Sequence, residues 1–158
     1  MAIIEIVPLV KDISGAESLR LVGPSLPVQV EVPTVLANEL DRTGKPLPSP
    51  VSGHGLIDTG ASITVVDLTV IQKLRLEPIG NTDVGFGAKK QAETYAVRVV
   101  FPGTALVPFD FEEVVGWDLA SATWAKGQIE TIVVLGRDIL KKFVVVYNGP
   151  QGRVTLAR

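Results

Sequence analysis

The most informative part of the sequence is the stretch Gly55-Leu56-Ile57-Asp58-Thr59-Gly60-Ala61-Ser62. An apolar segment, expected to be a buried strand, is followed at once by the carboxylate of Asp58 and a turn of small and hydroxylated residues. A carboxylate is rarely found next to a buried strand without a partner or a function, because burying a charge is costly. Gly60 permits a close or left-handed backbone, and the hydroxyls of Thr59 and Ser62 can orient a carboxylate. The pattern predicts that Asp58 is held in position.

Two other interpretations of Asp58 have to be weighed. The plainer one is an Asx turn, in which the side chain only caps the end of a strand. The Asp-Thr-Gly tripeptide alone leaves this interpretation open. The other is the phosphorylated aspartate of cation-pumping ATPases, which requires a lysine after the aspartate and a much longer chain with membrane helices. Thr59 stands in place of that lysine, so this interpretation is rejected.

Composition limits the function classes. The 158 residues, of which 46% are hydrophobic, are enough for one domain with a single packed core. Fifteen Lys and Arg against 17 Asp and Glu give a net charge of -2, so nucleic acid is not an expected partner. With no Cys and one His, the sequence offers no disulfide framework, no thiolate or histidine-rich metal site and no cysteine nucleophile. No metal or cofactor is expected, and the lone His54 is interpreted as a surface or loop residue, not a catalytic one.

The start of the chain does not have the pattern of a signal peptide. It is apolar, but it contains Glu5 and Pro8 and lacks a basic leading region. Elsewhere Pro, Gly or a charged residue interrupts every apolar run before it reaches the roughly 20 residues of a membrane-spanning helix. We therefore expect a soluble, cytoplasmic protein that has no membrane partner.

Short runs of Val, Ile, Leu and Thr, separated by Gly and Pro, predict a mainly β chain. The expected strands are residues 3–10, 28–36, 55–57, 94–101, 106–115, 132–135, 143–147 and 153–156. Two short helices are expected, one capped by Asp67 and running to about Leu74, and one after Gly136. The proline-rich residues 41–55 are expected to form an exposed loop.

Three segments of the sequence resemble the retropepsin-like aspartic proteases, the family of retroviral proteases and their cellular and bacterial relatives. Residues 56–62 match the family's hydrophobic-hydrophobic-Asp-Thr-Gly-Ala-Ser motif. The turn Val84-Gly85-Phe86-Gly87-Ala88 stands where the family has its flap hairpin. Residues 133–140 resemble the apolar-apolar-Gly signature and the short helix that close the family fold. The resemblance implies a closed acid-protease barrel, mainly β, with one or two short helices.

This resemblance also implies an oligomeric state. An aspartic protease needs two carboxylates in contact, and this chain contains one Asp-Thr-Gly. The second carboxylate would come from another copy, which predicts a homodimer with Asp58 of each subunit on the twofold axis. Two carboxyls in contact cannot both ionise cheaply, so they would share a proton and together activate a water. The expected activity is that of an endopeptidase acting on extended polypeptides.

By the same resemblance, the residues around Asp58 have supporting roles. Thr59 would bond across the dimer axis, Gly60 would line the cleft, and Ala61 and Ser62 complete the motif. The flap residues 84–88 would cover the substrate. Gly136, Arg137 and Asp138 are interpreted as structural: Arg137 can tie the helix to the active-site turn, and Asp138 can satisfy amides at the helix start. Retroviral members pair this arginine with an acid at the position of Ser62, so its partner here stays open.

Two further expectations concern organisation and activity. Residues 1–24 are interpreted as an N-terminal extension that adds an edge strand, covers part of the cleft or is removed by self-cleavage, and residues 25–158 as the protease domain. The alternative function is a peptide-binding or assembly module that keeps the fold but is catalytically weak or silent, because a fold does not guarantee an activity.

Overall fold

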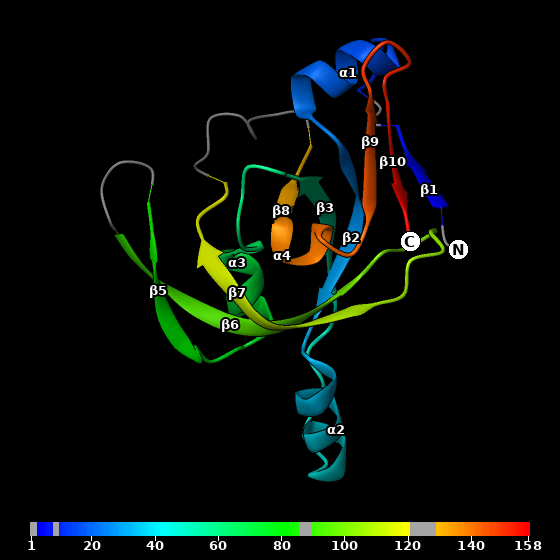
Figure 1. Cartoon of the computed structure of the whole chain (residues 1–158). Helices are drawn as coiled ribbons and strands as arrows, with labels where there is room; N and C mark the ends of the chain where they lie inside the picture. The colour runs from blue at the N-terminus through cyan, green and yellow to red at the C-terminus, as the bar shows by residue number, and fades with distance from the viewer. Residues whose placement is uncertain (1–2, 8–9, 86–89, 121–128) are drawn as a thin grey trace.

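The computed structural model describes residues 3–7, 10–85, 90–120 and 129–158 (Figure 1). The described strands are β1 (Ile3–Ile6), β2 (Ser25–Glu31), β3 (Val51–Ile57), β4 (Val65–Asp67), β5 (Gly80–Val84), β6 (Lys90–Val100), β7 (Phe109–Trp117), β8 (Thr131–Leu135), β9 (Val144–Asn148) and β10 (Arg153–Ala157). The described helices are α1 (Gly15–Val22), α2 (Thr34–Arg42), α3 (Leu68–Lys73) and α4 (Arg137–Leu140).

Six strands close into a barrel. Their order is β2-β3-β8-β4-β7-β6, and a further pairing of β6 with β2 closes the ring. In that closing pair Val30 lies opposite Val99. Among the described residues, the remaining strand of this sheet, β5, pairs with β6 alone, along residues 90–94. The prediction of a mainly β, closed barrel is confirmed.

The barrel is filled by β-branched side chains. From Leu26 to Glu31 in β2, buried positions alternate with exposed or half-buried ones, as expected for a strand with one buried face. Val30, Val97 and Val133 are completely buried, and the same cluster extends to Ile4 and Leu156 outside the ring. One continuous core therefore supports both the barrel and the strands that flank it.

A second sheet joins the two ends of the chain. Its order is β1-β10-β9, and Ile3 lies opposite Ala157, so the chain ends are neighbours (Figure 1). Helix α1 packs over the turn between β9 and β10, where a Cβ on Gly152 would lie 2.1 Å from the carbonyl carbon of Gly15. Residues of the leading segment therefore form the edge strand β1 and a helix fixed to the C-terminal hairpin.

Several expected boundaries are wrong. The first strand ends at Ile6 instead of Val10, and the second begins at Ser25 and ends at Glu31 instead of Leu36. Pro33 is the N-cap residue of α2, a position where a missing N–H is tolerated, so the apolar residues after it continue as helix. The short strands β4 and β5 were not expected at all.

The expectation of one or two short helices is also wrong, because the described residues contain four. Helix α3 and helix α4 lie where they were predicted. Helix α1 begins with Ser14 as its cap, whose hydroxyl accepts from the N–H of Glu17 at 3.2 Å. A serine followed three residues later by glutamate is a capping box, so the sequence contained a signal for this helix.

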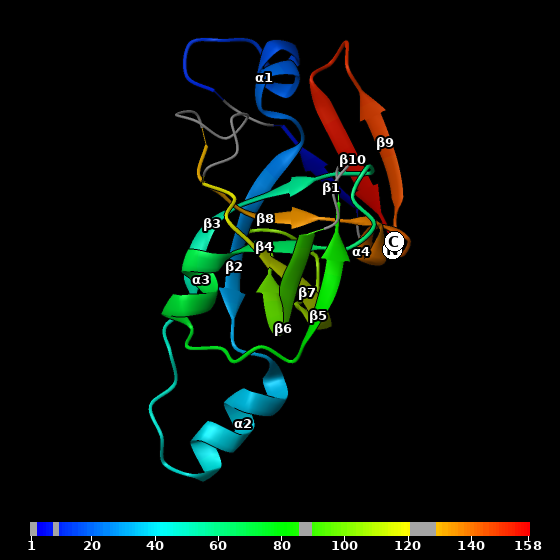
Figure 2. The same cartoon turned by 90° about the vertical axis from the view of Figure 1, so that its left-hand side faces the viewer.

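The predicted loop at 41–55 is shorter than expected, because α2 continues to Arg42 and β3 begins at Val51. Helix α2 projects away from the barrel in both views (Figures 1 and 2). It is anchored at its start, where the N–H of Thr34 donates to Asp110 at 2.7 Å. His54 is not a loop residue, since it lies within β3.

None of the described helices, whose longest has nine residues, has the length and apolar character needed to cross a membrane.

Candidate active site

Asp58 follows β3 directly. The N–H of Asp58 donates to the carbonyl oxygen of Leu135, the last residue of β8, at 3.0 Å. Strand β8 runs parallel to β3 and antiparallel to β4, so it lies between the two strands that the turn after Asp58 connects. Ile57 at the end of β3 and Leu135 at the end of β8 are both buried in the core, which fixes the point where the carboxylate leaves the barrel.

The Asp58 carboxylate is held at one of its two oxygens. Oδ1 accepts from the N–H of Gly60 at 2.7 Å, which is the contact of an Asx turn. Within the described ranges no hydrogen bond engages Oδ2 of Asp58. The side chain is half-buried, whereas Thr59 and Gly60 are exposed. The carboxylate is therefore oriented by its own turn and still has one oxygen available.

Of the two expected roles of Gly60, a close approach and a left-handed backbone, the structure confirms the close approach. Its backbone does not lie in the left-handed region. A Cβ at this position would lie 3.0 Å from Oδ1 of Asp58, closer than ordinary van der Waals contact. Glycine thus permits the close approach of the amide to the carboxylate, not an unusual turn conformation.

Arg137 holds the exposed part of the turn. Its Nη1 donates to the carbonyl oxygen of Thr59 at 2.7 Å and to that of Gly60 at 3.0 Å. Its backbone N–H donates to the carbonyl oxygen of Ala61 at 2.9 Å. The partners of Arg137 are main-chain oxygens, so this contact does not need an acid at position 62, where Ser62 is exposed.

Asp138 and Gly136 hold the inner part of the turn. The carboxylate of Asp138 accepts from the backbone N–H and the hydroxyl of Thr64, and also from the N–H of Ile139 at 2.9 Å. A Cβ on Gly136 would lie 2.6 Å from the carbonyl carbon of Ile63. The main chain of the turn therefore crosses directly over the start of α4.

Thr64 of this region was not identified from the sequence, whereas Asp67 was predicted as the cap of α3, which the structure confirms. Thr64 is completely buried, and its hydroxyl accepts from the N–H of Gly136 at 3.1 Å. Asp67 caps α3 by accepting from the N–H of Thr69 at 2.8 Å, and it also binds the N–H of Leu119 at 2.9 Å. Thr64 alternates with Ile63 and Val65, so strand periodicity could have placed it on the buried face with Val66.

The residues expected to form a flap are only partly described. Val84 ends β5 and pairs with Lys90 of β6, and Gly85 follows it. Phe86, Gly87 and Ala88 lie outside the described residues. In the described part of the chain, no hydrogen bond or ion pair joins Val84 or Gly85 to the turn at Asp58.

The described turn offers one carboxylate for chemistry. The acid of Asp138 is used by Thr64 and Ile139, and no group of three metal-ligating side chains occurs among the described residues. Activation of a water by two carboxylates therefore needs a second acid from outside this turn.

No protein-family model matches the sequence, and no curated protein sequence matches it either. Solved structures do match. A retropepsin-like aspartic protease from Rickettsia conorii aligns with a TM-score of 0.50 at 17% identity, over 98% of this chain and 89% of that one. The retroviral protease-like domain of Ddi1 from Leishmania major aligns with a TM-score of 0.44 at 14% identity, over 84% of this chain and 88% of that one.

A foamy viral protease-reverse transcriptase aligns with a TM-score of 0.42 at 16% identity, over 75% of this chain. The match covers 12% of that longer protein. At these identities the likeness concerns the fold. The alignment with the Rickettsia protein extends over nearly the whole chain. The chain therefore has the fold of the retropepsin-like aspartic proteases.

Proposed function

We propose that the protein is an aspartic endopeptidase that acts as a homodimer, with Asp58 of each subunit forming the catalytic pair. The observation that carries the proposal is the state of the Asp58 carboxylate. One oxygen is fixed by the N–H of Gly60 at 2.7 Å, and the other has no partner within the described residues. A carboxylate that served only as a cap would not need the exposed, tightly anchored turn in which it lies.

The exposure of the turn supports the dimer. Thr59 and Gly60 are exposed, although Arg137 and the buried strand ends hold their main chain rigidly. A rigid and exposed turn that carries a half-buried acid is suited to contact with a second copy of itself. In a twofold arrangement the same turn supplies both acids, so one Asp-Thr-Gly in the chain is sufficient.

In the proposed mechanism the two Asp58 carboxyls share one proton. The ionised member removes a proton from a water, and that water attacks the carbonyl carbon of the scissile amide. The protonated member donates to the carbonyl oxygen, where negative charge develops. The tetrahedral intermediate then breaks its C–N bond: the carboxyl that took the proton of the water gives it to the departing nitrogen, and the other carboxylate takes back the hydroxyl proton. The Gly60 amide keeps one carboxyl oxygen fixed, so the acid is already oriented before substrate binds. No metal or cofactor takes part.

The β5–β6 hairpin is the proposed cover for the substrate. Val84 pairs with Lys90 at the last described pair of the hairpin, and residues 84–88 would form its tip. An extended peptide under such a hairpin would be bound through main-chain hydrogen bonds, with alternate side chains in pockets. Substrates are therefore expected to be unfolded or extended polypeptides.

Cleavage of an unfolded protein between about pH 3 and about pH 8 tests the proposal. We expect the wild-type protein to hydrolyse peptide bonds and Asp58→Asn to lose at least about a hundredfold in rate, the usual scale for loss of an acid-base group. Asp41→Asn, an isosteric change in the exposed helix α2, should leave the rate unchanged. A wild-type dimer without any cleavage over this range would instead favour a binding or assembly module.

A further inference from the structure

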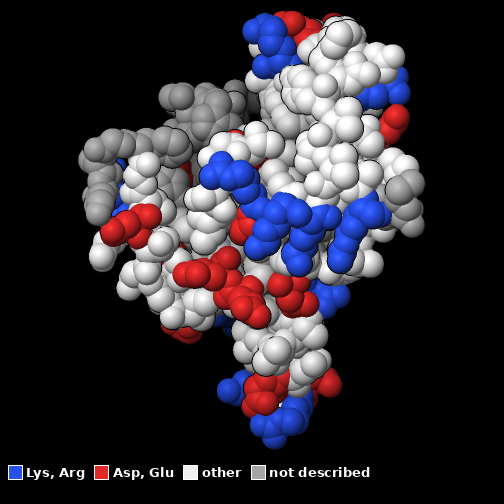
Figure 3. Space-filling view, viewed as in Figure 1, with Lys and Arg blue, Asp and Glu red and all other residues white. Residues whose placement is uncertain are grey.

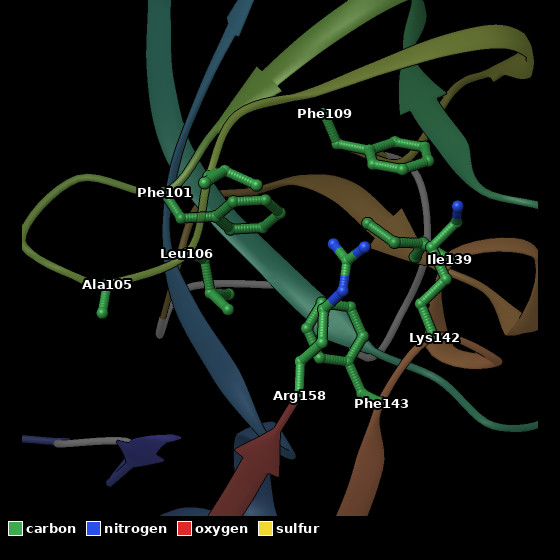
Figure 4. A pocket seen from close by; sticks show the side chains of 9 residues that line it. Phe101, Ala105, Leu106, Phe109, Ile139, Lys142, Phe143 and Arg158 are labelled. Carbon is green, nitrogen blue, oxygen red and sulfur yellow. The ribbon is translucent and has the colours of Figure 1, made fainter. Parts of the chain in front are cut away.

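A cavity separate from the Asp58 turn lies between the β6–β7 connection, helix α4 and the end of β10 (Figure 4). Its volume is about 430 Å³, within the usual range for small-molecule sites. The walls are mostly apolar and aromatic, and they are formed by Phe101, Ala105, Leu106, Val107, Phe109, Ile139 and Phe143. None of these residues belongs to the turn at residues 58–64.

Two cationic side chains complete the wall. Figure 4 shows the guanidinium of Arg158 projecting between the aromatic rings, and Lys142 at the rim beside Phe109. Nζ of Lys142 lies 4.9 Å from the centroid of the Phe109 ring. Among the described residues, no Asp or Glu side chain forms an ion pair with Lys142 or Arg158. The two positive charges at the cavity therefore have no acidic side chain paired with them.

The nearest acid along β7 does not supply this balance. Asp110 follows Phe109, but its two oxygens accept from the N–H and the hydroxyl of Thr34 at 2.7 and 2.8 Å. It also lies 3.5 Å from Nη1 of Arg98. Figure 3 shows Lys and Arg side chains gathered in a band on this face, with a group of acidic side chains below it. The cations of the cavity therefore remain available to a ligand.

We propose that this cavity binds a small ligand that has an apolar body and one carboxylate. The seven apolar or aromatic wall residues favour the burial of hydrocarbon, at about 25 cal/mol per Å² removed from water. The guanidinium of Arg158 can take a carboxylate with two parallel hydrogen bonds, and Lys142 adds a second positive charge at the rim. A neutral apolar ligand would remove water from around both cations without giving them a hydrogen-bond acceptor in exchange, which is unfavourable.

Two kinds of molecule combine an apolar body with one carboxylate. One is a medium-chain fatty acid, and the other is a peptide whose last residue has a large apolar side chain. The proposal does not depend on the proposed protease activity, since no residue of the cavity takes part in it. An experiment can therefore contradict the proposed ligand site without contradicting the proposed protease activity, and the reverse.

Nuclear magnetic resonance titration of the full-length protein tests the proposal, with octanoate and acetyl-Leu-Phe carboxylic acid as probes. We expect saturable shifts confined to the amides around the cavity for at least one of them, and the tighter of the two identifies the source. Octanol and the corresponding peptide amide are neutral controls and should bind about tenfold more weakly, the effect of one charge-assisted contact. Equal binding of the neutral probe, or no saturable shift with either acid, would overturn the proposal.

Variants of exposed residues provide the matched comparison. Lys142→Gln combined with Arg158→Gln should weaken the better acid at least about fivefold, since each partly exposed charge contributes modestly. Lys141→Gln removes a neighbouring exposed lysine that does not line the cavity and should have no effect. Ala105→Trp, at an exposed lining position, should block the cavity without altering the core. Unchanged affinity in both the double variant and Ala105→Trp would contradict this site.

Discussion

Thr64 donates both its backbone N–H and its hydroxyl to the carboxylate of Asp138, at 2.9 and 2.8 Å. The two residues are 74 positions apart in the sequence, and Thr64 is completely buried. This pair joins the turn that carries Asp58 to helix α4. The position of the proposed catalytic acid therefore depends on a contact that contains neither Asp58 nor its neighbours in the motif.

Replacing Asp138 by asparagine should destabilise the protein. An amide has one accepting oxygen in place of two, so one of the buried Thr64 donors loses its partner, at a cost of about 1–3 kcal/mol in unfolding free energy. Chemical denaturation measures this loss. Thr64→Val should destabilise in the same direction, whereas Thr64→Ser keeps the hydroxyl and should retain most of the stability. Equal stability of Thr64→Val and the wild type would show that this pair does not anchor the turn.

Gly136→Ala should be severely destabilising. The new Cβ would lie 2.6 Å from the carbonyl carbon and 2.7 Å from the carbonyl oxygen of Ile63, and main-chain atoms cannot move aside as a side-chain end can. We expect a loss of about 3 kcal/mol or more in unfolding free energy, at the upper end for overpacking. Gly149→Ala is the matched control, because its Cβ would meet only the Tyr147 ring, at 3.4 Å. Similar melting temperatures for the two variants would contradict the close crossing at Gly136.

The leading segment should be needed for folding. Ile4 is 8% exposed and Ile3 is 52% exposed in the same strand. Replacing each by alanine removes the same side-chain atoms, once from a buried position and once from an exposed one. We expect Ile4→Ala to cost about 2–4 kcal/mol and Ile3→Ala to cost well under 1 kcal/mol. Deletion of residues 1–24 removes Ile4, Ile6 and Leu19 from the core together and should prevent cooperative thermal unfolding. A shortened chain as stable as the full one would favour a segment that is removed by processing.

Stability should fall at high pH because of one tyrosine. Burial of Tyr95, together with its hydrogen bond to Glu93 and the negative charge of that residue, raises the pKa of Tyr95 to about 12. The unfolded chain loses this proton near pH 10. Between about pH 10 and about pH 12 the folded state binds more protons, so its stability falls as pH rises through this window and is unaffected by Tyr95 below it. Denaturation of Tyr95→Phe should lack this slope, and an identical pH profile for both proteins would contradict the assignment.

The parts of the site that the sequence predicted are those encoded locally. Asp58 is held by the amide of Gly60, two residues away, and helix α4 begins immediately after Gly136. Both follow from short-range turn and capping chemistry. Helix α1 was equally local, because Ser14 caps it by accepting from the N–H of Glu17, yet the apolar residues before it suggested a longer strand instead.

The parts that the sequence did not predict depend on contacts between distant segments. The closure of the barrel by β2 and β6, the pair Thr64 and Asp138, and the carbonyl partners of Arg137 each join residues more than 60 positions apart. Side-chain type limits which partners are possible, but only the packed fold selects one of them. The sequence showed that Arg137 needed acceptors, and the structure identifies them as main-chain oxygens.

Mixing wild-type and Asp58→Asn subunits tests most directly whether the active unit contains one acid from each copy. After subunit exchange at constant total protein, we predict that peptide cleavage per wild-type chain falls to about half in an equal mixture and toward zero in a large excess of the variant, because random pairing leaves few dimers with two acids. Cleavage per wild-type chain that stays constant at every ratio would mean that a single copy is sufficient and would contradict the shared pair.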